Sequence, residues 1–334
     1  MAATVAPAGT TGAAAVTETA EEAVTETAEA VAEGLVTGPA EEDGPEAAEV
    51  ATATGNLNQH HISPTRAGGF ALATINVVVH GALGRMGQEV LRAVTNAEDM
   101  TPVGGADGMA EPGSLTLPDG SGTVPVSNAL ADMLENADVV VDFSSAAGAM
   151  DVIRTATAGK VNVVVGSTGL SDDNYAEAEN LANQHQVGVI IAPNFALGGV
   201  LMIHLVKMAA QYFDYADLTE MHHEAKIDAP SGTAIAIANA AVEGKGGPFL
   251  APKAEKELIP DSRGGDSDGV TVHSARMPGR MAHHELVFGA LGQTLTIRHD
   301  SINRESFMPG VTMAIREVVN RKGLTVGLDK IMGL

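Results

Sequence analysis

The densest group of chemically active side chains lies in one stretch, EMHHEAKIDAPSGTA at residues 220–234. His222 and His223 titrate near neutral pH and Lys226 carries a fixed positive charge, so this stretch supplies a proton donor beside a cation. Ser231 precedes an Ala- and Ile-rich segment and is expected to be the N-cap of a helix. The first free N–H groups of that helix, at residues 232–233, would bind an anion. The stretch therefore predicts a site for a small dicarboxylate that accepts a hydride and then a proton.

Metal binding is one alternative for the paired histidines. Neighbouring residues on a strand point to opposite faces, so His222 and His223 would rarely share one ion, and we predict no metal. Histidines that are buried for structural reasons, with their hydrogen bonds satisfied, are another alternative. A second pair, His283 and His284, opens the strand-like segment HELVFG and is expected to be structural or to lie at the edge of the substrate site.

A glycine-rich loop, GALGRMG at residues 81–87, follows a β-branched run at residues 75–79 and precedes a segment with helical spacing of apolar residues. Strand, glycine turn and helix open a dinucleotide-binding unit, in which N–H groups at the helix start hold the pyrophosphate. The spacing G-x-x-G-x-x-G departs from the usual G-x-G-x-x-G, so an ordinary strand–helix turn is the alternative. Asp107 is expected to accept hydrogen bonds from the ribose, and Arg85 would meet a 2′-phosphate. We predict NADH or NADPH as the cofactor.

Apolar runs at residues 138–143, 161–165 and 187–191 continue as strands, with a helical stretch at residues 173–185. This alternation predicts a Rossmann-like, doubly wound parallel sheet. Ligands of such sheets bind beyond the carboxyl ends of the strands. The small and polar residues that follow these three runs are therefore expected to form a bed for the nicotinamide and its ribose. They are Ser144, Ser145, residues 166–169 and residues 192–195.

The second half of the chain has a different pattern. Strand-like segments at residues 270–277, 285–289 and 293–299 follow one another, with turns expected at Gly279, Gly289 and Gly292. We predict a second α+β domain with an open mixed sheet, while a helical segment at residues 310–321 packs back on the first. The expected division is a dinucleotide-binding domain at residues 74–195 and 301–334, and a substrate-binding and oligomerisation domain at residues 196–300.

Composition excludes several classes of protein. The 42 acidic and 19 basic residues give a formal net charge of −23, which repels a phosphate backbone, so no nucleic-acid partner is expected. The lack of cysteine excludes disulfides, thiolate metal ligands and a cysteine nucleophile. No apolar run reaches the ~18 residues of a membrane span. We expect no membrane association and a cytoplasmic enzyme with a small-molecule partner.

Residues 1–73 differ from the rest of the chain. They hold eleven acidic residues and one basic residue, Arg66, and repeat AVTETAE at residues 15–21 and 23–29. Such a segment buries too little apolar surface to offset the entropy lost on ordering. It also has neither the basic start and apolar stretch of a secretory signal nor the arginines of a transit peptide. A disordered acidic tail is predicted.

Several motifs together resemble the 4-hydroxy-tetrahydrodipicolinate reductase family, also called dihydrodipicolinate reductase. They are GALGRMG, VVVGSTGL, IIAPNFALG, EMHHEAKIDAPSGTA, HSARMPG, HHELVFG and RESFMPGVTMAIR, in this order from about residue 75 to 331. The resemblance implies reduction of 4-hydroxy-2,3,4,5-tetrahydrodipicolinate in lysine biosynthesis via diaminopimelate. It also implies a homotetramer assembled through the second domain's sheet.

Carried over by position, the resemblance places the proton donor on His222 and a second, substrate-contacting histidine on His223. The catalytic or carboxylate-pairing lysine is Lys226, and the substrate-binding Gly-Thr pair is Gly232 and Thr233. The implied cofactor contacts are Gly81, Ala82, Leu83, Gly84, Arg85, Met86, Asp107, Gly166, Ser167, Thr168, Ala192, Pro193, Asn194 and Phe195.

Two rival functions share parts of this pattern. A dehydrogenase of the same fold acting on another small dicarboxylate would keep the glycine loop but would not need two histidines and a lysine beside a helix start. A non-catalytic NAD(P) sensor would keep nucleotide binding without His222 and Lys226. The residues at 220–234 favour the reductase.

Overall fold

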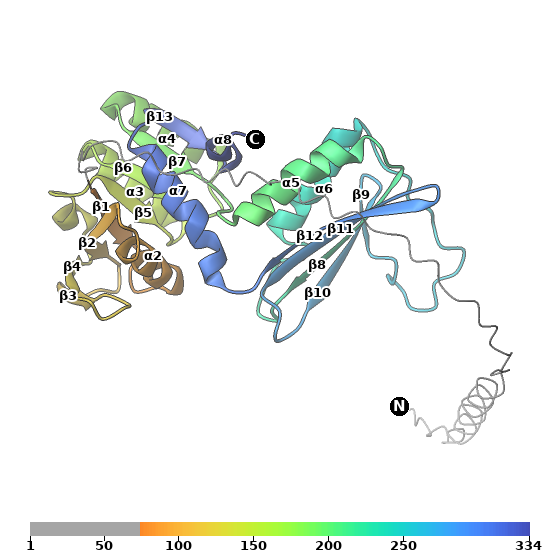
Figure 1. Cartoon of the computed structure of the whole chain (residues 1–334), viewed down its shortest axis with the longest axis horizontal. Helices are drawn as coiled ribbons and strands as arrows, with labels where there is room; N and C mark the ends of the chain where they lie inside the picture. Colours follow the sequence, from red (N-terminus) through yellow and green to blue (C-terminus); the bar gives the residue numbers. More distant parts are fainter. Residues whose placement is uncertain (1–73) are drawn as a thin grey trace, which may run out of the picture. The chain divides into compact units, whose positions relative to one another are not determined.

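The computed structural model describes residues 74–334, so the predicted acidic tail of residues 1–73 lies outside the described residues. Two β-sheets with different strand order organise this part of the chain, and each has its own helices (Figure 1). No helix within residues 74–334 is both long and apolar enough to span a bilayer.

The first sheet has eight strands in the order β13-β7-β6-β5-β1-β2-β4-β3, and only the β3–β4 pair is antiparallel. The predicted strands at residues 75–79, 138–143, 161–165 and 187–191 correspond to β1, β5, β6 and β7. These central strands are runs of valine and isoleucine because both of their faces are buried. The strands are β1 (Ile75–His80), β2 (Met100–Ala106), β3 (Gly113–Thr116), β4 (Thr123–Ser127), β5 (Val139–Asp142), β6 (Asn162–Val165), β7 (Gly188–Ile191) and β13 (Gly323–Val326).

Helices cover both faces of this sheet. On one face, α2 (Arg85–Thr95) and α7 (Met308–Val318) share a core with the alternate strand residues that include Val77. On the other face, α3 (Ala146–Ala158) and α4 (Asp172–His185) pack with the intervening residues. The expected Rossmann-like, doubly wound fold is confirmed, and the C-terminal helical segment packs in its core as predicted.

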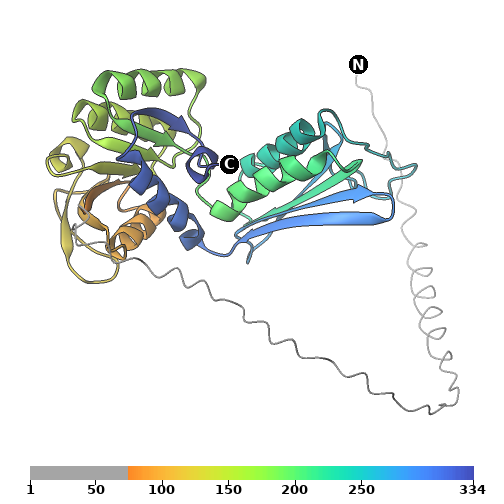
Figure 2. The same ribbon diagram turned by 45° about the horizontal axis from the view of Figure 1, so that its top comes forward.

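The second sheet has five strands in the order β12-β11-β8-β10-β9, with β8 and β10 parallel and the other pairs antiparallel. The helices α5 (Leu197–Ala210) and α6 (Gly232–Lys245) lie side by side along one side of this mixed sheet (Figures 1 and 2). Gly289 was expected in a turn, but it pairs within β11, and the turn lies at Gly292 with φ +74°. The strands are β8 (Tyr215–His222), β9 (Gly265–Ser267), β10 (Val270–Arg276), β11 (Ala282–Ala290) and β12 (Gln293–Ser301).

Candidate active site

The glycine loop turns the chain between β1 and α2. Gly81 has φ +75°, and a Cβ added at Gly87 would lie 2.1 Å from the carbonyl oxygen of Gly81, so both positions require glycine. Helix α2 begins with neither a side-chain cap nor an acidic residue in its first turn, which leaves its first N–H groups available to an anion. The Asp107 carboxylate accepts a hydrogen bond from the Leu83 N–H at 3.0 Å, so the predicted ribose acceptor lies against the loop. This loop fits the pyrophosphate and ribose of a dinucleotide.

The three predicted strand ends lie at one edge of the sheet, because β5, β6 and β7 are adjacent and parallel. A Cβ at Gly166 would lie 2.0 Å from the Phe143 ring, so only glycine fits where the chain leaves β6. Beyond β7, the Asn194 side chain accepts a hydrogen bond from the Ala196 N–H at 2.9 Å, and the rings of Phe143 and Phe195 lie 5.7 Å apart. Residues 166–168 and 192–195 therefore share one edge, as expected of a cofactor bed.

A buried carboxylate, Asp142, lies beneath this bed and was not anticipated from the sequence. It accepts hydrogen bonds from the hydroxyls of Ser144 and Ser167 at 2.6 and 2.7 Å, and it lies 2.7 Å from Nδ1 of His80. The Ser167 hydroxyl in turn accepts the Ser144 N–H at 2.9 Å. The carboxyl ends of β1, β5 and β6 are thus joined through one fully buried side chain.

His222 is the last residue of β8, and its imidazole is buried. Its Nδ1 is hydrogen-bonded to the carboxylate of Glu220, which lies two residues earlier on the same face of the strand. Burial lowers the pKa of His222 below its ordinary value, although the Glu220 carboxylate acts in the opposite direction. The nearby charges of Lys226 and Arg276 lower it further.

Glu220 is fully buried, and hydrogen-bond donors surround its carboxylate. The Arg276 guanidinium donates two hydrogen bonds to it, at 2.7 and 3.0 Å, and the Ser231 N–H donates a third at 3.3 Å. Burial favours the neutral carboxyl group, but the hydrogen bonds from Arg276, Ser274 and His222 outweigh it and hold the pKa of Glu220 below its ordinary value. Glu220 is therefore a buried anion at neutral pH.

Helix α6 begins as predicted, with Ser231 as its N-cap. The Ser231 hydroxyl accepts the Ala234 N–H at 3.1 Å and lies 3.1 Å from Nε2 of His284. Among residues 74–334, no protein acceptor meets the N–H groups of Gly232 and Thr233. This arrangement suits an anion at the start of α6.

Lys226 and His223 follow His222 in the loop between β8 and α6. The Lys226 ammonium group lies 2.7 Å from the carboxylate of Asp228 and is largely shielded from solvent, and its charge is close enough to act on His222. His223 is exposed just beyond the strand. The structure thus gathers His222, Lys226 and the start of α6 in one cluster and leaves His223 at its rim.

His284 has a structural place in this cluster. It pairs opposite Glu220 across β8 and β11, and its ring meets that of His222 edge-on at 5.3 Å. Burial lowers the pKa of His284 to about 4, so it is neutral at pH 7. His283, in contrast, lies 2.6 Å from the carboxylate of Asp300 on the neighbouring strand β12.

Glu220, His222 and His284 also present one potential metal-ligand atom each, all within 4.8 Å of one another. The hydrogen bonds of these three residues argue against a metal site. Both oxygens of Glu220 already accept hydrogen bonds from Arg276, and His284 Nε2 faces the Ser231 hydroxyl. These ligand atoms are thus already engaged in hydrogen bonds within the protein, and the absence of a metal stays a prediction.

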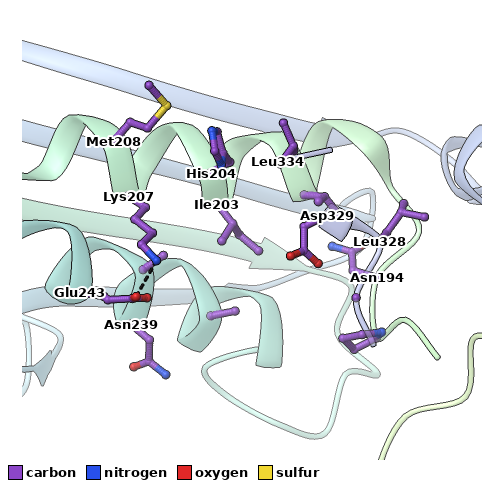
Figure 3. Close-up of a pocket in the computed structure, with 15 residues that line it drawn as sticks. Asn194, Ile203, His204, Lys207, Met208, Asn239, Glu243, Leu328, Asp329 and Leu334 are labelled. Carbon is purple, nitrogen blue, oxygen red and sulfur yellow. Dashed lines mark hydrogen bonds and ion pairs between the residues drawn. The ribbon is translucent and has the colours of Figure 1, made fainter. Parts of the chain in front are cut away.

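A cavity of about 590 Å³ lies between α5, α6 and the C-terminal residues (Figure 3). Of the predicted site residues it is lined only by Pro193 and Asn194. One end of it holds the ion pair of Lys207 and Glu243 at 2.5 Å, drawn as a dashed line in Figure 3. The proposed proton donor and anion site lie outside this cavity.

The structure therefore forms two groups of predicted residues, a cofactor bed on the first sheet and a proton-donor cluster on the second. Within residues 74–334, no hydrogen bond links the two groups. A glycine loop at a helix start, a strand-edge bed and a buried histidine beside a lysine define a pyridine-nucleotide-dependent oxidoreductase.

Comparison with known proteins agrees with this class of oxidoreductase and narrows it to one family. Residues 75–195 match the family "Dihydrodipicolinate reductase, N-terminus", and residues 198–332 match "Dihydrodipicolinate reductase, C-terminus". The 4-hydroxy-tetrahydrodipicolinate reductase of Dehalococcoides mccartyi is 48% identical over 265 residues, which cover 79% of this chain and all of the relative. That of Moorella thermoacetica is 42% identical over 266 residues, covering 78% and 99%.

A solved structure is also similar to this chain. Dipicolinate-bound dihydrodipicolinate reductase from Paenisporosarcina sp. TG-14 has a TM-score of 0.69 and 38% identity, over 77% of this chain and 99% of that one. The chain belongs to the dihydrodipicolinate reductase family.

Proposed function

We propose that this protein reduces 4-hydroxy-2,3,4,5-tetrahydrodipicolinate, in lysine biosynthesis via diaminopimelate. In the balanced reaction, the substrate, NAD(P)H and one proton give 2,3,4,5-tetrahydrodipicolinate, NAD(P)⁺ and water. The observation that carries the proposal is the buried His222, bonded to the Glu220 anion and next to a helix start whose first N–H groups meet no acceptor in the described part of the chain. Membership of the family and the dipicolinate named for the Paenisporosarcina structure support the same substrate.

In this proposal, each substrate group meets one feature of the cluster. The N–H groups of Gly232 and Thr233, together with Lys226, hold a carboxylate and orient the ring. His222 donates the proton from Nε2, while its Nδ1–H remains hydrogen-bonded to the Glu220 carboxylate. His223, at the exposed rim of the cluster, contacts the substrate from its outer side. Lys226 exchanges its partner Asp228 for the substrate carboxylate when the substrate binds.

The cofactor, NADH or NADPH, supplies the hydride when it is bound. We assign its pyrophosphate to residues 81–86, its ribose to Asp107, and its nicotinamide end to residues 166–168 and 192–195. Asp107 favours the free hydroxyl of NADH, whereas Arg85, at the start of α2, would pair with the phosphate of NADPH. Comparing kcat/KM for the two nucleotides in wild type and Arg85→Ala tests the second contact, because loss of Arg85 should weaken only NADPH.

We further propose a cytoplasmic homotetramer. The face of the second sheet that α5 and α6 leave uncovered is the proposed assembly surface, with residues 74–195 and 301–334 forming the dinucleotide-binding domain and residues 196–300 the substrate-binding domain. Light scattering should then give four times the mass of the 34.0 kDa chain, and cell fractionation should recover the enzyme with cytoplasmic markers.

The decisive experiment is an assay with purified protein. The protein is incubated with 4-hydroxy-2,3,4,5-tetrahydrodipicolinate and NADH or NADPH, and oxidation of the cofactor is followed by absorbance. Cofactor oxidation that requires this substrate, with tetrahydrodipicolinate as product, is the expected result. Cofactor oxidation without that product, or none at all, would reject the proposal.

A further inference from the structure

Three strands of the second sheet converge on one carboxylate. Glu220 lies on the central strand β8, which is flanked by β10 and β11. Pairing places Arg276 of β10 opposite His222, and His284 of β11 opposite Glu220. These four residues are separated by up to 64 positions along the chain. His222 and Arg276 are hydrogen-bonded directly to Glu220, and His284 joins them through Ser231, whose N–H donates to Glu220.

We infer that Glu220, clamped by Arg276, is the residue that positions and charges His222 for proton donation. The inference rests on the proposed function of His222 and adds Glu220 and Arg276 to the residues on which the proton transfer depends. In the step itself, the N–H bond at Nε2 breaks and the proton passes to the reduced ring. The Nδ1–H remains on His222, Glu220 stays ionised throughout, and His222 takes its next proton from water.

Electrostatics around the imidazole show why an anion is needed there. The charged or titratable groups that face His222 are Glu220 on its own strand, Arg276 on β10, His284 on β11 and Lys226 in the following loop. Glu220 is the only one of these that stabilises the imidazolium ion, since the others are cationic or become so on protonation. Burial and the cations keep the pKa of His222 below its ordinary value even with Glu220 in place, so without Glu220 the protonated donor would be scarcer still at neutral pH.

Arg276 determines where that anion lies. Its two hydrogen bonds fix the plane of the Glu220 carboxylate, and a third, at 2.7 Å, goes to the backbone carbonyl of Asp228. Asp228 belongs to the loop that carries Lys226. The Arg276 guanidinium thus connects Glu220 to the loop that carries Lys226. The Ser231 N–H connects the same carboxylate to the start of α6.

Glu220→Gln tests the inference because it removes the charge and keeps the shape. We expect kcat to fall about 10- to 100-fold, a part of what general acid catalysis contributes, with the KM for NAD(P)H unchanged. The descending limb of the pH profile of kcat/KM should move to lower pH, since His222 loses its anion. Glu285→Gln is the matched control, because it makes the same change on β11, on a residue paired with Arg298. It should leave kcat and the pH profile of kcat/KM unchanged.

A wild-type pH profile in Glu220→Gln, with folding shown by circular dichroism, would overturn the inference. If the variant does not fold, nitrogen-15 NMR of histidine-labelled wild-type protein decides the matter, with His222→Gln assigning the signal. The inference requires the neutral ring to carry its proton on Nδ1, and a proton on Nε2 would refute it. The proposed function fails separately, if wild type produces no tetrahydrodipicolinate.

Discussion

Replacing Ser231 by alanine would remove two hydrogen bonds at the point where α6 begins. The hydroxyl caps the helix through the Ala234 N–H and faces Nε2 of His284, both at 3.1 Å, and Ser231 is only 2% exposed. Loss of an N-cap costs about 1 kcal/mol, and a buried polar nitrogen left without a partner costs about 1–3 kcal/mol more. We therefore expect the free energy of unfolding to fall by about 2–4 kcal/mol.

Ser171→Ala is the matched control, because Ser171 caps α4 through the Asn174 N–H at 3.3 Å but is exposed and bonds no histidine within residues 74–334. It should cost about 1 kcal/mol. Urea unfolding followed by circular dichroism, at pH 7 and one protein concentration, measures both variants. Equal losses in the two would refute the role given to the contact between Ser231 and His284.

Three further predictions follow from the two clusters. His222→Gln should lower turnover about 10²- to 10⁴-fold with cofactor affinity unchanged, and an undiminished kcat would remove His222 from the reaction. Asp142→Asn should destabilise the protein by about 1–3 kcal/mol and raise the KM for NAD(P)H. The reason is that one of the three donors around the buried carboxylate loses its acceptor. An unchanged KM would show that this network does not support the cofactor bed. The pKa of His284 is about 4 when folded, against about 6.5 when unfolded, so the unfolded chain binds the extra proton first. The free energy of unfolding should then fall as the pH drops from about 6.5 to 4, by up to about 3 kcal/mol, and His284→Gln should remove this part of the pH dependence.

Much of the first sheet could be predicted because its signals are local. A β-branched run followed by a glycine loop specifies β1 and the start of α2, and buried parallel strands are continuous apolar runs. Strands β3 and β4 were missed, since the short β3 is exposed along most of its length and carries no continuous apolar run. The sequence predicts a turn at Gly289 because glycine usually marks one, whereas the second sheet accommodates this residue within β11.

The sequence by itself determined the parts of the candidate active site that lie within one continuous stretch. His222, Lys226 and the capped start of α6 occupy residues 222–233, so they remain neighbours however the rest of the chain folds. Only the tertiary structure decided which groups surround them. Arg276 and His284 reach Glu220 because β10 and β11 pair with β8 in one register, and shifting either strand by one residue would turn its side chain to the opposite face of the sheet.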